Sequence, residues 1–195
     1  MTDQETTSDN RPFWQLFNKD LSEHTAVLSA FRRGISKEPG EVPEMWPFYR
    51  ELQESGFLTR KLRAEHLTMV LFAIHQQSAS YKVHRGDVEE APGVSIATAL
   101  RKLRDNDKFS KEALDKRFMR AVTNTDVTRM VLHLQGLIKQ LKAAKLELPL
   151  NYDLLFRDLK DWQDPLRIAS VKRRWAGQYY GKSTQNKTEK AETAK

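Results

Sequence analysis

The residues of this 195-residue chain that could do chemistry are its lysines and arginines, which recur at helical spacing in several stretches. Between positions 101 and 120, eight basic residues stand against four acidic ones, a net charge of +4. Basic side chains that repeat along one face of a helix form a ridge that can bind successive phosphates of a nucleic acid. The alternative is that these charges keep a helical protein soluble or complement the dipole at a helix end.

The pattern of charges singles out individual candidates for phosphate contact. In the stretch 95–104, Arg101 and Arg104 flank a stripe of apolar residues, and Lys102 points away from it. Arg117 lies beside Phe118, and we expect it to be half-buried against a carboxylate or backbone carbonyls. On charge pattern alone, the further candidates are Lys108, Lys116, Arg120, Lys139 and Lys142.

No pattern typical of catalysis or metal binding is present. The five histidines form no HExxH motif, and the absence of cysteine excludes disulfides and thiolate zinc sites. We predict that His75 and His133 are hydrogen-bonded core histidines. The clustered carboxylates lie in loop-like sequence, without the apolar surroundings that raise a carboxyl pKa for acid–base catalysis. The sequence therefore predicts no enzyme activity, no metal site and no cofactor.

The composition favours a helical protein with a polyanionic partner. Hydrophobic residues make up 39% and charged residues 30% of the chain, and the net charge is +7. Residues 1–60 have a net charge of −3 and residues 61–195 one of +10, an asymmetry typical of nucleic-acid binding. The polar, acidic N-terminus resembles neither a signal nor a transit peptide, so a cytoplasmic location without membrane attachment is expected.

The aromatic residues do not alternate with the basic ones. We predict that they occupy core positions on amphipathic helices, which argues against a platform for stacking bases. This favours contact with the nucleic-acid backbone, without sequence readout. The aromatic residues assigned to the core in this way are Trp46, Trp162, Trp175, Phe156 and Tyr179.

The element that must position these residues is the stretch from Leu62 to His75. From Leu67 to Ile74 only Thr68 is polar, and the run is too short to span a bilayer. A helix that is apolar nearly all round belongs in the middle of a bundle. We expect its first turn, with Arg63, Glu65 and His66, to remain in water.

The remaining elements are predicted from caps and periodicity. Ser95, Ser110 and either Thr125 or Asp126 are expected to cap helices, and Gly34 to end one in the left-handed conformation. No segment alternates with the period of a strand. The predicted fold is all-α, a single helical bundle of about eight helices over residues 13–180. Residues 1–12 and the polar tail 181–195 are expected to be disordered.

Several segments, taken in order, resemble the CasB family, the small subunit of the type I-E CRISPR surveillance complex Cascade. The resemblance covers roughly residues 13–180 and is carried by their order rather than by any single motif. The segments are FRRG at 31–34, Trp46, FAIH at 72–75, SIATALRKLR at 95–104, HLQGLIKQL at 133–141, YDLLFRDLKDW at 152–162 and the spaced Val171, Trp175 and Tyr179.

This resemblance implies a non-catalytic all-α protein whose two copies associate head to tail. The implied partners are the backbone and large subunits of Cascade, with the guide RNA nearby. The implied role is to keep the R-loop open by holding DNA, including the displaced single strand, on a basic surface. The positions it adds as nucleic-acid contacts are Arg32, Arg33 and the cations of 95–104. The alternative is a structural helical adaptor whose basic face binds acidic protein partners.

Overall fold

The computed structural model describes residues 10–181 and has an all-α fold, as the sequence predicts. In the described residues the only β-type pairings are isolated bridges from His84 and Val94 to Leu150. The predicted disordered segments, 1–12 and 181–195, lie almost entirely outside the described range. In chain order the elements are α1 (Phe13–Leu16), α2 (Ser22–Arg33), the short 3-10 helices η1 (Gly34–Ser36) and η2 (Pro43–Phe48), α3 (Arg60–Gln76), α4 (Ile96–Arg104), α5 (Lys111–Thr123), α6 (Val127–Ala143), α7 (Tyr152–Trp162) and α8 (Ile168–Tyr180).

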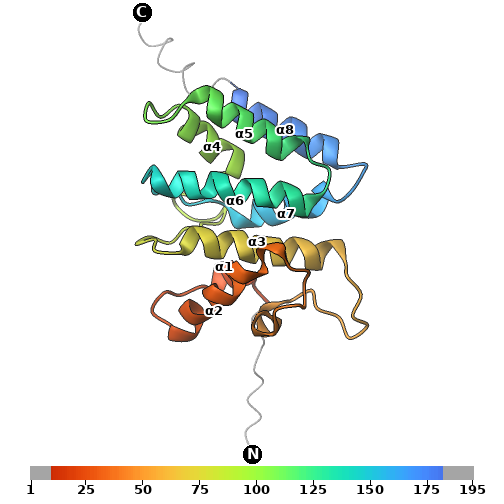
Figure 1. Cartoon of the computed structure of the whole chain (residues 1–195). Coiled ribbons are helices and arrows are strands. Elements are labelled where there is room, and N and C mark those ends of the chain that lie inside the picture. Colours follow the sequence, from red (N-terminus) through yellow and green to blue (C-terminus); the bar gives the residue numbers. More distant parts are fainter. Residues whose placement is uncertain (1–9, 182–195) are drawn as a thin grey trace, which may run out of the picture.

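The helices are stacked in layers, with α3 between the N-terminal and C-terminal parts (Figure 1). On one side α3 packs against α1, α2 and η1, and on the other against α6 and α7. The remaining helices, α4, α5 and α8, form the far layer, where α4 packs on α8 and α5 on α6. Helix α6 therefore touches both the central helix and the far layer.

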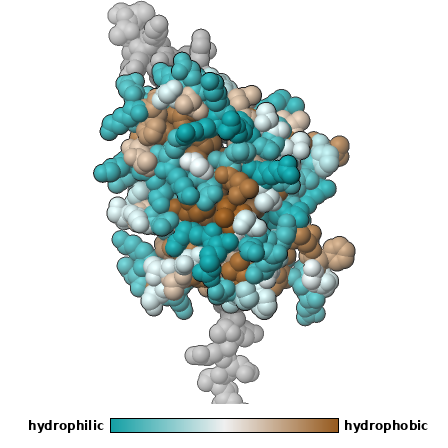
Figure 2. Space-filling view, in the orientation of Figure 1, coloured by the Kyte–Doolittle hydropathy of each residue, from teal (hydrophilic) through white to brown (hydrophobic). Residues whose placement is uncertain are grey.

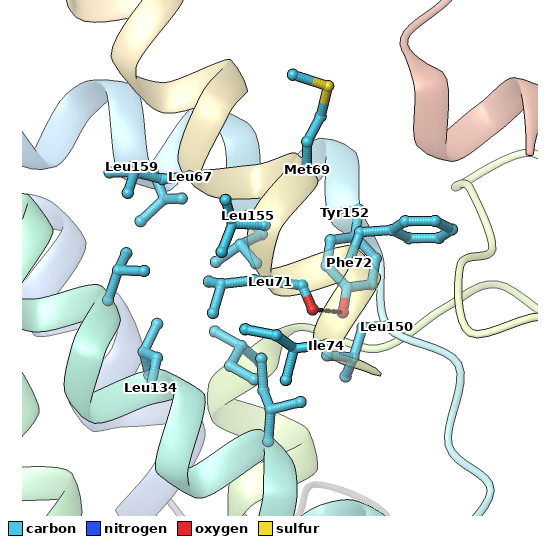
Figure 3. Packing of buried hydrophobic residues seen from close by; sticks show 14 of the residues in the cluster. Leu67, Met69, Leu71, Phe72, Ile74, Leu134, Leu150, Tyr152, Leu155 and Leu159 are labelled. Atoms are coloured by element: carbon cyan, nitrogen blue, oxygen red, sulfur yellow. Dashed lines mark hydrogen bonds between the residues drawn. The ribbon is translucent and has the colours of Figure 1, made fainter. Parts of the chain in front are cut away.

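The prediction that α3 is the central helix is confirmed. Thr59 caps it by accepting a hydrogen bond from the Leu62 amide, and every residue from Leu67 to Gln76 is buried. Figure 3 shows Phe72 against Tyr152 of α7, with Leu134 reaching the same core from α6. A helix with no wet face in its second half is stable only with neighbours on all sides.

The first turn of α3 is not wet, contrary to the expectation from sequence. Glu65 and His66 are buried because the segment from Gly34 to Glu51 folds over this turn. The carboxylate of Glu65 accepts hydrogen bonds from the Arg50 side chain and from two backbone amides. His66 Nε2 donates to the Gly34 carbonyl at 2.8 Å, which leaves Nδ1 to accept from the Tyr49 hydroxyl at 2.7 Å.

Gly34 follows α2 but does not adopt the left-handed conformation predicted for it, since its φ is −70°. The chain continues instead into η1. A Cβ atom at this position would lie 2.9 Å from His66 Cε1 and 3.1 Å from Met45 Sδ. Glycine is required here because another element approaches the backbone closely.

The predicted caps of the later helices are confirmed. Ser95, Ser110 and Asp126 each accept a hydrogen bond from the backbone amide three residues on. Such caps satisfy amides that have no partner within the helix. They fix where α4, α5 and α6 begin, and so which face each basic side chain occupies.

Candidate nucleic-acid interface

The basic end of α4 is largely engaged inside the protein. Arg104 Nε donates to Asp115 Oδ1 of α5 at 2.7 Å, and its guanidinium lies over the rings of Tyr179 and Tyr180. The Tyr179 hydroxyl donates to the same carboxylate oxygen at 2.9 Å. The hydrogen bond to Asp115 raises the pKa of Arg104. This arginine ties α4 to α5 and α8.

The two neighbours of Arg104 differ in their exposure. Arg101 is half-buried and donates to the Gly181 carbonyl at 3.1 Å. Lys102 is exposed, as its position opposite the apolar stripe predicts. Within the described residues Lys102 makes no ion pair or side-chain hydrogen bond. It is the cation of this helix that is free to meet a phosphate.

A second group of cations comes from α2 and α6, far apart in the sequence. Lys142 Nζ donates to the carbonyls of Ile74 and Gln77, and so binds the C-terminal end of α3. Desolvation lowers the pKa of Lys142, and the positive charges of Arg32 and Lys139 lower it further. The contact of α6 with η1, which directly follows α2, brings these three side chains into one region of the surface, which we call the α2–α6 cluster.

Within the α2–α6 cluster, the available charges belong to Arg32 and Lys139. Neither makes an ion pair in the part of the chain that the structure describes. Arg33 differs because it pairs with Glu44 at 2.6 Å. Both partners of that pair are more than half exposed, and such pairs contribute little to stability. Arg33 can thus exchange its carboxylate for another anion at small cost.

Helix α5 presents its cations to solvent. Lys116 and Arg120 are exposed, as is Lys108 in the turn before the helix. The expectation for Arg117 is wrong, because this side chain is exposed and no carboxylate or carbonyl holds it within residues 10–181. Position beside a buried phenylalanine does not bury an arginine when the neighbouring helix carries no acidic partner there.

Arg117 and Arg120 line a groove between α5 and α6, with a volume of about 220 Å³. We call it the α5–α6 groove. The α6 side of its wall consists of Leu132, His133, Gly136 and Leu137. His133 is half-buried at this wall and has no hydrogen-bond partner among the described residues, so the prediction of a hydrogen-bonded core histidine is wrong for it. The same prediction is confirmed for His75, which is buried against the Tyr152 hydroxyl at 3.0 Å.

One face of α6 is left uncovered along the whole helix by the described residues. Residues at helical spacing on it are all exposed. Figure 2 shows hydrophobic patches mixed with hydrophilic surface in the middle of this side of the molecule, at the level of α3 and α6. This face connects the α5–α6 groove with the α2–α6 cluster, because it includes Lys139 as well as two of the groove residues of α6, Leu132 and Gly136. Its members are Arg129, Leu132, Gly136, Lys139 and Ala143.

Comparison with known proteins agrees with this architecture. Residues 27–180 match the family described as CRISPR-associated protein Cse2. The chain belongs to the Cse2 family. A CRISPR-associated protein Cse2 from Thermus thermophilus is 26% identical over 168 residues, which cover 86% of each chain. This confirms the resemblance found from the ordered sequence segments.

Two solved structures have the Cse2 fold seen here. The crystal structure of a Cse2-family CRISPR-associated protein from Thermus thermophilus has a TM-score of 0.63 at 23% identity, covering 87% of this chain and 94% of its own. CasB from Thermobifida fusca also has a TM-score of 0.63, at 21% identity, covering 86% and 91%. At these identities the likeness establishes the fold.

Two features of this Cse2-family chain were not found from its sequence. The sequence pattern predicts a half-buried Arg117 and does not single out Arg129, although the spacing of Leu132 and Lys139 places Arg129 on the same helix face. Trp46 was assigned to the core, but half of its surface is exposed. Together with Leu52, Phe57 and Leu58 it lines a surface cavity of about 300 Å³, which we call the apolar hollow.

Within residues 10–181 the acidic and histidine side chains do not gather into a metal site. No group of three or more potential ligands is close enough to hold an ion within the described part of the chain. None of the described helices is both long and apolar enough to cross a membrane.

Proposed function

We propose that this chain is the non-catalytic small subunit of a type I-E CRISPR Cascade complex, and that it stabilises the R-loop by binding DNA. The observation that carries the proposal is the gathering of Arg32 and Lys139, from helices distant in sequence, beside the uncovered face of α6. Cations that have no carboxylate partner keep their full attraction for phosphates. In RNA-guided recognition, base pairing supplies the sequence specificity, so a subunit that holds displaced DNA needs only backbone contacts.

The surface chemistry fits a strand held without sequence readout. Within the described residues, the candidate cations that make no ion pair lie on α2, α5 and α6 and in the turn before α5, and no aromatic residue lines the α5–α6 groove. Lys102 of α4 adds one more. Such a set binds phosphates and leaves the bases unread. The displaced single strand is the ligand with this character in an R-loop, and the guide RNA would be held by other subunits.

The apolar hollow supports the subunit part of the proposal. Phe57 is 73% exposed and Trp46 50% exposed, which is costly for a monomer in water. The acidic residues around the hollow are mostly paired, as Glu51 is with Lys61 and Glu38 with Arg63. This neutral, apolar surface suits a protein partner, a Cascade subunit or a second copy, and not a nucleic acid.

The experiment that tests the proposal removes the free charges of the α2–α6 cluster. Arg32→Ala with Lys139→Ala should weaken binding of the full chain to single-stranded DNA. The log–log dependence of affinity on salt should become less steep by about 1.4, at roughly 0.7 per lost phosphate contact. In reconstituted Cascade, the same variant should assemble normally but hold the displaced strand less tightly.

The matched control is Lys19→Ala with Arg173→Ala. It removes the same two charge types from exposed positions on other elements. If both double variants lose affinity equally, net charge alone attracts DNA and the proposed surface is wrong. If the Arg32/Lys139 variant binds DNA normally but fails to enter the complex, the cluster contacts protein, and the alternative of a structural adaptor is supported.

A further inference from the structure

The α5–α6 groove has a feature that the packing of the protein does not explain. Gly136 lies in the interior of α6, where glycine costs about 1 kcal/mol relative to alanine. A Cβ atom at this position would have no atom within 4 Å, so no neighbouring element needs the space. Gly34 shows the contrast, because there a Cβ atom would collide with His66. Gly177 of α8 has the same open space, but of the two only Gly136 lines a groove beside two arginines, so the room at Gly136 is available to a ligand of that groove.

The walls of the groove indicate the chemistry of that occupant. Arg117 and Arg120 line one side, and neither makes an ion pair within residues 10–181. A guanidinium binds phosphate oxygens in a planar, two-pronged geometry. On the opposite side, Leu132 is 42% exposed and adjoins the open backbone at Gly136. The groove thus offers two cations facing an apolar wall.

The size of the groove restricts the occupant further. Its volume of about 220 Å³ is below the roughly 300–1,000 Å³ typical of sites that enclose a small molecule. A phosphodiester with its sugar needs less room and can enter and leave along an open groove. A strand is therefore a better fit than a free nucleotide cofactor or metabolite.

We propose that the α5–α6 groove is a binding site for a single phosphate–sugar unit of single-stranded DNA, with Arg117 and Arg120 on the phosphate and the sugar against Leu132 and Gly136. This inference rests on the proposed function and adds a specific binding site to it, which we call the seat. The strand continues along the uncovered face of α6. Lys139 lies seven residues beyond Leu132 on that face, or about 10 Å at 1.5 Å per residue. The seat and the α2–α6 cluster then bind neighbouring stretches of one strand.

A steric variant tests the seat without changing any charge. Gly136→Leu fills the groove from its floor, and Gly177→Leu on α8 is the matched control, since its Cβ would also meet no atom within 4 Å. The probe is a fluorescein-labelled single strand of about 20 thymidines, longer than the roughly 4–16 nucleotides of typical single-strand sites. Gly136→Leu should raise the Kd about tenfold at low salt, and Gly177→Leu should leave it unchanged.

A charge variant tests the cations independently. Arg117→Ala with Arg120→Ala should reduce the salt slope by about 1.4, while circular dichroism retains its helical signal. A thermal melt of each variant establishes that it is folded, and Gly136→Ala replaces the leucine variant if that protein does not fold. The alanine variant should then raise the Kd about twofold, with Gly177→Ala as its control.

The outcomes separate the seat from the wider function. If both groove variants bind like the wild type while Arg32→Ala with Lys139→Ala binds weakly, the seat is wrong and the DNA-binding function stands. If Gly177→Leu weakens binding as much as Gly136→Leu, the steric effect is unspecific and the seat is also wrong. If the wild-type chain shows no salt-dependent binding to the strand, the proposed function fails, and the seat with it.

Discussion

The arginines found at the two sides of α5 differ in whether the protein neutralises their charge. On the side facing α8, Asp115 binds Arg104 and the Tyr179 hydroxyl, so the positive charge is neutralised within the protein. On the side facing α6, Arg117 and Arg120 line a groove whose other wall has no acidic residue. The difference lies in the partner helix rather than in the arginines. Positive charge is most available to a ligand where the fold supplies no carboxylate.

The histidines show the same contrast. His75 is buried, donates from Nδ1 to Tyr152 and accepts at Nε2 from Tyr81 at 3.3 Å. Its polar atoms are satisfied, and it helps to hold α3 against α7. His133 lines the α5–α6 groove without such a partner in the described residues. A polar side chain that the protein does not use internally marks the surface where a ligand is expected.

The largest predicted effect concerns His75, the histidine whose polar atoms are satisfied within the protein. Burial, and then the positive charge of Lys142, lower the pKa of His75 from 6.5 to about 3. Below the unfolded-state pKa of 6.5, the unfolded chain binds a proton that the folded protein does not. Stability therefore falls as the pH falls through this range, by up to about 1.4 kcal/mol per unit. Between about pH 6 and pH 4 the free energy of unfolding should drop by about 2.5 kcal/mol from His75 alone.

His75→Gln isolates that contribution from the acid sensitivity of other groups. Desolvation also lowers the pKa values of His66 and His84, so the variant should retain part of the slope. Chemical denaturation at a series of pH values measures both proteins. Equal slopes for variant and wild type would show that His75 is protonated in the folded state, which contradicts its burial.

A second prediction concerns the shared carboxylate on α5. Asp115→Ala removes the partner of Arg104 and the acceptor of the Tyr179 hydroxyl together. Hydrogen bonds that involve a charged group are worth about 1.5–3 kcal/mol, so the free energy of unfolding should fall by about 2–3 kcal/mol. Affinity for single-stranded DNA should stay the same or increase, because the change frees Arg104. Loss of DNA affinity would mean that this side of α5 also binds the strand.

The sequence could reveal which residues are basic but not which are neutralised. The caps at Ser95, Ser110 and Asp126, and the burial of Leu67 to Ile74, follow from local spacing, so they could be predicted. The pairing of Arg104 with Asp115 depends on how α4 meets α5, eleven residues apart and through a turn. Local pattern assigns Arg104 to phosphate contact and Arg117 to a half-buried position, the reverse of what the structure shows. Their difference arises only when the helices pack.

The same limit explains the errors around α3. Nothing in its first turn indicates that Glu65 and His66 are buried, because the covering segment comes from residues 34–51. Trp46 is a large aromatic residue in a helical turn, and most such residues are buried. That Trp46 instead lies exposed beside Phe57 in the apolar hollow can be seen only in the folded structure. Whether a residue is buried by a segment distant in the sequence is decided by the fold and not by local pattern.

A third prediction compares an engaged arginine with an open one directly. Arg104→Ala should lower the free energy of unfolding by about 1–2 kcal/mol, because Asp115 and the tyrosine rings lose their partner. Arg117→Ala should change it by less than about 0.5 kcal/mol, as is usual at an exposed position. For DNA affinity the order reverses, and Arg117→Ala has the larger effect. If both variants behave alike in the two assays, the two sides of α5 are not different in function.

The smallest predicted effect is a gain in stability from a substitution in the α5–α6 groove. Gly136→Ala should raise the free energy of unfolding by up to about 1 kcal/mol, because alanine is the better helix former and its methyl group meets no atom within 4 Å. Gly177→Ala on α8 should give a similar gain for the same reason. DNA affinity separates the two, since only Gly136 lines the groove. A stabilising change that weakens binding would show that the glycine is kept for the ligand and not for the fold. If Gly136→Ala destabilises the protein, the methyl group meets an obstacle inside the chain, and the space at Gly136 belongs to packing.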